Sequence, residues 1–218
     1  NVSEQTIGEW IHSRNIRDKV WISTKGGHPP IEHLQVSRIN EKELTLDIEK
    51  SLYYLNTDYI DIYYLHRDAP QKPVEEIMPI LDKFVKSGKI RCLGASNWTS
   101  ARIEAANKFA KQNGLEPFRF NQIMWSYAKV NKEGEPDDTL RIMDEEEFEF
   151  IKKSDLVLMP YSSQAQGFYT LAAKNGVESL SERHKAKYLN AINLKRLEKL
   201  KRISKETGIS PTAVSLNH

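Results

Sequence analysis

Several features that would assign this protein to a class are scarce or missing. Cys92 is the one cysteine among 218 residues, so no intramolecular disulfide forms, and we expect a reducing, cytoplasmic setting. No apolar run is as long as a membrane span, and the first residues lack a signal-peptide pattern. Lys and Arg total 32 against 30 Asp and Glu, for a net charge of +2. This balance gives no electrostatic reason to expect a nucleic acid or a membrane as partner.

Several well-known motifs are also missing. The sequence contains neither G-x-G-x-x-G nor G-x-x-x-x-G-K-[ST], the glycine patterns that hold phosphates. It contains no G-x-S-x-G, so Ser162 and Ser163 lack the strained turn of a hydrolase nucleophile. We expect no metal site, and we expect surface or loop positions for the histidines that lack metal-ligand spacing, which are His12, His28, His33, His184 and His218.

Short β-favouring runs alternate with segments of helical spacing along the whole chain. The predicted strands are 20–24, 60–65, 90–95, 118–123 and 156–161. The predicted helices are 3–11, 40–55, 74–85, 100–111, 144–153, about 194–203, and one that begins at 210. Five strand–helix repeats predict an α/β fold with a parallel sheet, and the lack of a linker predicts a single domain over residues 1–218.

Local signals sharpen three of these helices. Asn40 is expected to cap the second helix, with Glu43 as its capping-box partner. Pro79 is expected to delay the start of the third helix or to kink it, because proline removes a backbone donor. The apolar face of the first helix is expected to consist of Ile7, Trp10 and Ile11.

Polar or ionisable residues stand at or just after the end of every predicted strand. They are Lys25, His66, Ser96 with Asn97, Gln122, and Tyr161 with Ser162 and Ser163. In a parallel sheet these ends face the same side, so we expect the groups to meet in one cleft. The simpler alternative is that loops are polar anyway, and that His66 only forms a hydrogen bond at a strand end. It explains one or two positions but not the amides Asn121 and Gln122 within a buried strand, since buried amides need partners.

At these residues the chain resembles the aldo-keto reductase family. The matching stretches are VWISTKGGHP at 20–29, DIEKSLYYLNTDYIDIYYLHR at 47–67, GKIRCLGASNW at 88–98, NQ at 121–122 and MPYSSQAQG at 159–167. The resemblance implies a TIM (β/α)8 barrel, present here as a partial barrel without the first strands and the last strand–helix unit. It also implies the reduction of an aldehyde or ketone to an alcohol with NADP(H), bound without a Rossmann fold.

The resemblance assigns roles to seven residues. Lys25 and His66 correspond to the lysine and histidine of the family's Asp-Tyr-Lys-His catalytic tetrad. Ser96, Asn97 and Gln122 correspond to the residues that hold the nicotinamide carboxamide. Tyr161 matches the aromatic residue that stacks on the nicotinamide ring, and Ser162 matches a residue near the pyrophosphate.

Elementary chemistry makes these roles reasonable. A carbonyl that accepts hydride must also receive a proton, and a tyrosine with a pKa of about 10 is a reluctant acid. A nearby ammonium such as that of Lys25 makes the tyrosine anion less costly. A histidine such as His66 polarises the carbonyl by donating a hydrogen bond to its oxygen.

The chain departs from the family pattern at three places. The tetrad Asp and Tyr, in a D-T-A-x-x-Y pattern, are expected before Asn1, and the adenosine-phosphate loop is expected after His218. We therefore expect the chain to be an excerpt that is inactive by itself. The loop after Tyr161 reads Ser-Ser-Gln-Ala-Gln where many members have Ser-Pro-Leu, which leaves the pyrophosphate contact open.

Other functions stay open at this point. One is a non-catalytic, nucleotide-binding relative that serves as a subunit or sensor, and another is an unrelated α/β-barrel enzyme. Trp98 and Trp125 either line a substrate pocket or only pack against neighbouring loops. The carbonyl substrate, the preference for NADP or NAD, and the oligomeric state are not determined by the sequence.

Overall fold

The computed structural model describes residues 2–217, which form two compact units. Unit 1 contains residues 2–122 and 144–159, and unit 2 contains residues 123–143 and 160–217. Each unit has its own cluster of buried apolar side chains.

A parallel sheet forms the centre of unit 1. Within the described residues it has five strands in the order β1-β2-β3-β4-β5, and every neighbouring pair is parallel. The strands are β1 (Ser23–Gly26), β2 (Ile60–Leu65), β3 (Ile90–Ser96), β4 (Phe118–Gln122) and β5 (Val157–Leu158). The predicted α/β fold is confirmed. The sheet is not closed, since β1 and β5 are its edges in the described part of the chain, as expected of a partial barrel.

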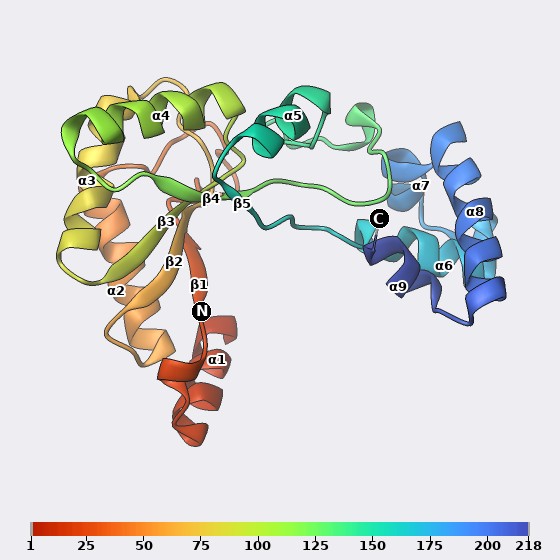
Figure 1. Cartoon of the computed structure of the whole chain (residues 1–218), viewed down its shortest axis with the longest axis horizontal. Helices are drawn as coiled ribbons and strands as arrows, with labels where there is room; N and C mark the ends of the chain where they lie inside the picture. The colour runs from red at the N-terminus through yellow and green to blue at the C-terminus, as the bar shows by residue number, and fades with distance from the viewer. Residues whose placement is uncertain (1, 218) are drawn as a thin grey trace. The chain divides into compact units, whose positions relative to one another are not determined.

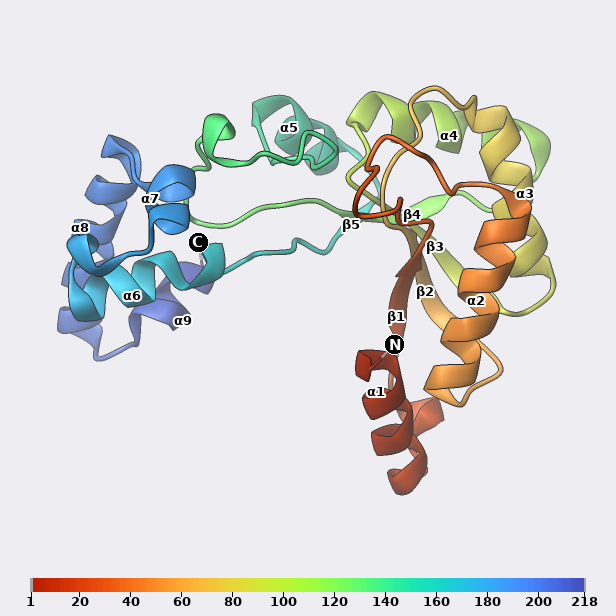
Figure 2. The same cartoon turned by 180° about the vertical axis from the view of Figure 1, so that it is seen from behind.

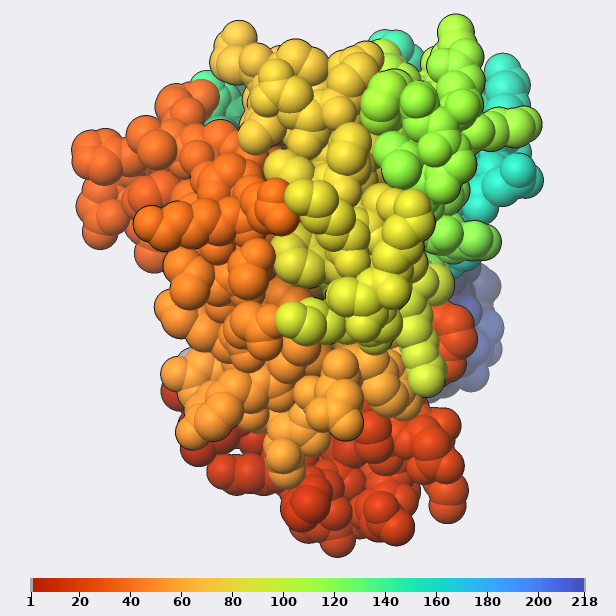
Figure 3. Space-filling model, turned by 90° about the vertical axis from the view of Figure 1, so that its left-hand side faces the viewer, coloured from red at the N-terminus to blue at the C-terminus, as the bar shows by residue number. Residues whose placement is uncertain are grey.

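Helices cover one face of this sheet. Those of unit 1 are α1 (Val2–Arg14), α2 (Glu41–Leu55), α3 (Val74–Lys86), α4 (Ser100–Asn113) and α5 (Glu145–Lys153), with the 3-10 helix η1 (Arg17–Lys19). Figure 1 shows α2, α3 and α4 following one another along the sheet, and Figure 3 shows their surfaces side by side from outside. Leu44 and Ile48 of α2 and Ile77 of α3 are fully buried together with Leu65 of β2. This layer fixes where the strands end.

The cap of α2 is confirmed, but its capping box is only half formed. The Asn40 side chain accepts a hydrogen bond from the Glu43 backbone N–H at 3.0 Å. The return bond is absent because the Asn40 N–H donates to the Arg38 carbonyl and the Glu43 carboxylate accepts from the Arg38 guanidinium at 2.8 Å. The capping residue is thereby tied to the loop that precedes the helix.

One expectation about the helices is wrong, and of the two alternatives for Pro79 the late start is excluded. The third helix has no late start, since α3 begins at Val74 and runs through Pro79. In α1 the buried residues are Glu4, Gly8 and Ile11, whereas Ile7 and Trp10 are 45% and 47% exposed. Gly8 decides this face because a Cβ there would lie 2.7 Å from the Leu55 carbonyl, so only glycine lets the two helix backbones approach so closely.

The first and last strands are shorter than predicted. β1 begins at Ser23, and Trp21 is 70% exposed. Side chains satisfy part of the preceding backbone, although the Ile22 carbonyl still accepts from the Ile62 N–H of β2 at 3.1 Å. The Asp61 carboxylate accepts from the Ile22 N–H at 2.9 Å, and Arg17 donates to the Val20 carbonyl at 3.0 Å. β5 consists of Val157 and Leu158 only.

Unit 2 is a small helical assembly (Figure 2). Its helices are α6 (Phe168–Asn175), α7 (Glu182–Tyr188), α8 (Ala191–Thr207) and α9 (Pro211–Leu216), with the 3-10 helices η2 (Lys132–Gly134), η3 (Ala165–Gly167) and η4 (Val177–Ser179). Helix α8 lies where the apolar spacing predicts it, and α9 begins at the predicted start signal of Ser210 and Pro211. Helices α6 and α7 were not predicted, because each spans only about two turns and shows little periodicity. Phe168, Tyr188 and Leu197 are buried at the centre of the unit.

Candidate active site

Lys25 and His66 line one cavity of unit 1. The cavity measures about 860 Å³ and is bordered by residues of α1, β1 and α2 and by the loop after β1. Parallel pairing places the two residues together, because Gly26 of β1 pairs with Leu65 of β2 and the His66 N–H donates to the Gly26 carbonyl at 2.9 Å. Neighbouring strand ends therefore bring an amine and an imidazole to the same place.

Burial and like charge act on both groups. The pKa of the Lys25 ammonium is lowered from 10.5, first by burial and then by the positive charge of Arg67. The pKa of His66 is lowered from 6.5 to about 3, mainly by burial and then by His28, Arg67 and Lys25. His66 is therefore an uncharged imidazole at neutral pH, able to donate one hydrogen bond and accept another.

His28 lies directly against His66. The two rings meet in a T-shaped contact with their centroids 4.6 Å apart and their planes at 77°. His28 is a loop residue, as expected, but it is half-buried and lines the same cavity. Its Nδ1 lies 2.6 Å from the Pro29 carbonyl, which can only accept, so we assign the proton of the neutral ring to Nδ1.

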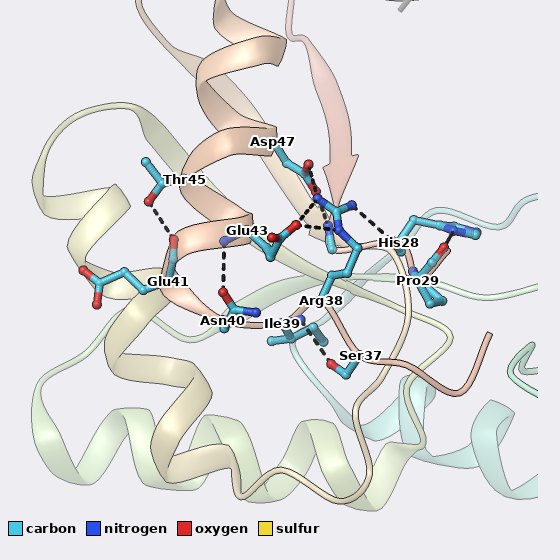
Figure 4. Close-up of polar contacts among 11 residues, drawn as sticks. His28, Pro29, Ser37, Arg38, Ile39, Asn40, Glu41, Glu43, Thr45 and Asp47 are labelled. Atoms are coloured by element: carbon cyan, nitrogen blue, oxygen red, sulfur yellow. Dashed lines mark hydrogen bonds and ion pairs between the residues drawn. The ribbon is translucent and has the colours of Figure 1, made fainter. Parts of the chain in front are cut away.

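Three charged side chains, which we call the Arg38 clamp, hold the loop that carries His28. They are Arg38, Glu43 and Asp47 (Figure 4). Arg38 pairs with Glu43 and Asp47 at 2.7 and 2.8 Å and also donates to the His28 carbonyl at 3.1 Å. Asp47 in addition accepts from the Gly27 N–H at 2.8 Å. The clamp thus holds two backbone groups of this turn, the Gly27 N–H and the His28 carbonyl, against the first turns of α2.

Three further predicted residues lie at the same edge of the sheet. Ser96 ends β3 and pairs with Gln122 at the end of β4, and the Asn97 N–H donates to the Gln122 carbonyl at 3.2 Å. The Asn97 amide donates to the His66 carbonyl and to the Ser96 hydroxyl, both at 3.2 Å. Asn97 adopts a left-handed conformation with φ of 62°, which asparagine tolerates better than most residues. These contacts bring Ser96, Asn97 and Gln122 beside the His66 backbone.

The Gln122 side chain has an unused acceptor. Its Oε1 atom is buried and finds no hydrogen-bond partner among residues 2–217. The neighbouring Asn121 amide is fully buried and likewise lacks partners within that range. Within residues 2–217 the protein therefore provides no partner for three of the four polar side-chain atoms of these two amides.

Tyr161 and Ser162 belong to unit 2. The Tyr161 backbone bonds to Ile123 and Trp125, at 3.1 and 3.2 Å. Ser162 has a φ of 56°, and its carbonyl accepts from the Ala165 N–H at 2.8 Å. Beside this turn lies a cavity of about 560 Å³, lined by Ser162, Ser163, Gln164, Gln166, Gly167 and Leu216.

The structure decides the role of one of the two tryptophans. Trp98 is fully buried, stacks edge-on against Phe118 at 5.1 Å, and donates its indole N–H to the Arg67 carbonyl at 3.1 Å. The substrate-pocket interpretation of Trp98 is therefore wrong, and the packing interpretation is correct. Trp125 is half-buried in unit 2.

Sequence reasoning missed His28 and the Arg38 clamp as parts of the cavity wall. Asp47 falls within one of the family-like stretches, but nothing in its spacing relates it to Gly27, twenty residues earlier. Among the described residues, no three His, Cys, Asp or Glu side chains gather as metal ligands do. None of the helices in residues 2–217 combines the length and apolar character needed to cross a bilayer.

Comparisons with known proteins agree on one family. Residues 1–218 match the Aldo/keto reductase family. The chain is 36% identical over 139 residues to an aryl-alcohol dehydrogenase of Pestalotiopsis microspora, which covers 61% of this chain and 36% of that protein. It is 36% identical over 134 residues to norsolorinic acid reductase A of Aspergillus parasiticus, covering 58% and 34% of the two chains. A norsolorinic acid reductase of Emericella nidulans is 28% identical over 228 residues, covering 98% and 53%. The chain thus spans about a third to a half of the length of these relatives.

Proposed function

The chain belongs to the aldo/keto reductase family, and from that premise we propose that the full-length protein reduces an aldehyde or ketone with NADPH. The observation that carries this proposal is the cavity in which Lys25 and His66 meet at two neighbouring strand ends. The family's barrel fold also supports the proposal that residues 1–218 belong to one barrel domain. A cytoplasmic location is proposed on the single cysteine.

The residues present fit a nicotinamide cofactor. The buried Gln122 Oε1 has no donor within the described residues, and a carboxamide N–H would provide one. The Ser96 hydroxyl accepts from Asn97 and keeps its own proton to donate to a carboxamide oxygen. Gln122, Ser96 and Asn97 would therefore hold the carboxamide, while Tyr161 and Ser162 are proposed for the ring and the pyrophosphate.

The protein's own residues would prepare the carbonyl. A bound nicotinamide supplies the hydride. His66, uncharged at neutral pH, donates a hydrogen bond to the carbonyl oxygen and orients it. The Lys25 ammonium lowers the cost of negative charge on oxygen in a partly buried place, where such an interaction is stronger than in water.

The names of the relatives support an aromatic substrate. They include an aryl-alcohol dehydrogenase and norsolorinic acid reductases. The competing proposal is a non-catalytic nucleotide-binding relative. The joint presence of Lys25 and His66 in one cavity favours the enzyme, because nucleotide binding needs neither.

The test is the oxidation of NADPH by the full-length protein, followed by its ultraviolet absorbance, with an aromatic and an aliphatic aldehyde. We expect turnover that depends on the aldehyde and is faster with the aromatic one. Tight NADPH binding without turnover of any aldehyde or ketone would instead support the non-catalytic alternative.

A further inference from the structure

One side of the His66 ring is contacted by a residue to which neither the chemistry above nor the family resemblance assigns a role. His28 contacts the His66 ring in the T-shaped arrangement, with centroids 4.6 Å apart. An edge-to-face contact of this geometry is a favoured arrangement of aromatic rings, so it resists rotation of either ring. The orientation of His66 therefore depends on where His28 is held.

His28 is itself held on three sides. Its Nδ1 bonds to the Pro29 carbonyl, and its own carbonyl accepts from Arg38 of the Arg38 clamp. Asp47 of the same clamp accepts from the Gly27 N–H immediately before it. Gly27 is buried and has a φ of 71°, a conformation that favours glycine, so the turn that aims His28 is specified by the backbone as well.

We propose that His28, fixed by the Arg38 clamp, is a positioning residue that sets the orientation of the His66 ring. This inference rests on the proposed function, since it concerns how His66 meets a carbonyl substrate. His28 acts through His66 and not on the reacting atoms. Arg38 and Asp47 act one step further away, by holding the His28 backbone.

The other charged groups around His66 are consistent with this role. Lys25 and Arg67 lower the pKa of His66 together with His28, and burial is the largest cause. The carboxylates of the cavity already accept hydrogen bonds from other groups. Glu4 accepts from Thr24 and Ser51, and Asp47 accepts from Arg38 and Gly27. The remaining titratable groups along the cavity wall are Lys50 and Tyr54.

The first experiment compares His28→Ala and His28→Phe in the full-length protein, with NADPH and an aromatic aldehyde. His28→Ala removes the ring contact, and we expect kcat to fall about ten- to a hundredfold, the cost of a misplaced catalytic group. The KM for NADPH should stay within about twofold. His28→Phe keeps a ring at the same place and should restore most of kcat. A wild-type kcat in His28→Ala, or an equally low kcat in both variants, would overturn the proposal.

The second experiment does not depend on activity. Nitrogen NMR of the histidine rings follows the protonation of His66 in the wild type and in His28→Ala. We expect His66 to remain uncharged to lower pH in the wild type than in the variant. Equal midpoints would overturn the inference even if the enzyme is active. A wild type that binds NADPH but reduces no carbonyl would instead remove the proposed function and leave this readout intact.

A pair of arginine variants tests the clamp. Arg38→Met should lower kcat in the same direction as His28→Ala but by less, because the Asp47 bond to Gly27 remains. Arg17→Met is the matched control, since Arg17 also forms a partly buried ion pair, with Asp61, but touches no residue of the His28 turn. A similar loss of kcat in both arginine variants would mean that general destabilisation explains the effect, and the clamp role would be withdrawn.

Discussion

Two amide side chains, Asn193 in unit 2 and Gln122 in unit 1, differ in how fully their buried polar atoms are hydrogen-bonded. Asn193 uses its whole hydrogen-bonding capacity within the protein. Its Oδ1 accepts from the Lys129 N–H and the Tyr169 hydroxyl, and its Nδ2 donates to the carbonyls of Lys129 and Tyr188, all within 3.1 Å. The Gln122 Oε1 is buried without a partner among residues 2–217. A buried amide with every bond formed stabilises the fold, whereas one with an unused acceptor is suited to a ligand.

One lysine of each unit shows the same contrast, Lys187 being buried and Lys25 half-buried. Lys187 of unit 2 is buried and forms an ion pair with Glu135. In unit 1, burial and the like charge of Arg67 both lower the pKa of Lys25, so both disfavour its ammonium form. Within residues 2–217, unit 2 compensates its buried charge internally, while unit 1 provides no carboxylate partner for the Lys25 cation. Such uncompensated groups are typical of reacting sites.

The largest expected effect concerns Lys25. Lys25→Met in the full-length protein removes the cation beside His66, and we expect turnover to fall about a hundredfold or more, the range for losing an electrostatic contribution at a reacting oxygen. The affinity for NADPH should change much less. Steady-state kinetics and a fluorescence titration measure the two quantities.

Lys83→Met is the control for that substitution. Lys83 is 62% exposed at its side chain and forms only a surface ion pair with Glu41, so turnover should stay at the wild-type value. Full activity in Lys25→Met would remove Lys25 from the reacting centre.

The next effect is on stability and is confined to unit 2. Asn193→Ala leaves the Lys129 and Tyr188 backbone groups without their partner, so we expect the free energy of unfolding to fall by about 2–3 kcal/mol. Urea unfolding followed by circular dichroism measures it. The affinity for NADPH of the protein that remains folded should be unchanged. A loss of affinity without a loss of stability would reverse the roles that we assign to the two amides.

Gln122→Ala should give the opposite pattern. We expect the binding of NADPH to weaken by about 1–3 kcal/mol, because the carboxamide loses its acceptor, while the free energy of unfolding stays nearly constant. Fluorescence titration and urea unfolding of the same variant provide both numbers. Unchanged affinity would mean that Gln122 serves only the sheet.

The smallest effect is a dependence of stability on pH. The pKa of His66 lies at about 3 in the folded protein and near 6.5 when unfolded, so the unfolded state binds the proton first as the pH falls. Above pH 6.5 the protonation of His66 does not reduce the free energy of unfolding. As the pH falls from 6.5 toward 3, this free energy decreases progressively. We expect a loss of about 1–2 kcal/mol between pH 6.5 and about 5. His66→Gln should flatten this slope, and His12→Gln on the exposed face of α1 should not.

Much of the fold follows from patterns that are local in sequence. Apolar spacing and capping residues placed α2, α4 and α8 within a few residues, because core-facing periodicity and caps are properties of short segments. Local patterns did not predict where β1 begins. Arg17 and Asp61 satisfy the backbone before Ser23, and both lie outside the apolar run that suggested a longer strand.

Strand-end positions were predictable from the amino-acid sequence alone, and with them the candidate set Lys25, His66, Ser96, Asn97 and Gln122. Parallel strands end at a common edge, so order along the chain was sufficient. Only the tertiary structure decided that His28 contacts His66, that Arg38 and Asp47 hold its turn, and that Trp98 packs in the core. The ring contact joins residues 38 positions apart and the Asp47–Gly27 bond residues 20 apart, and no local pattern encodes which distant partner a side chain will meet.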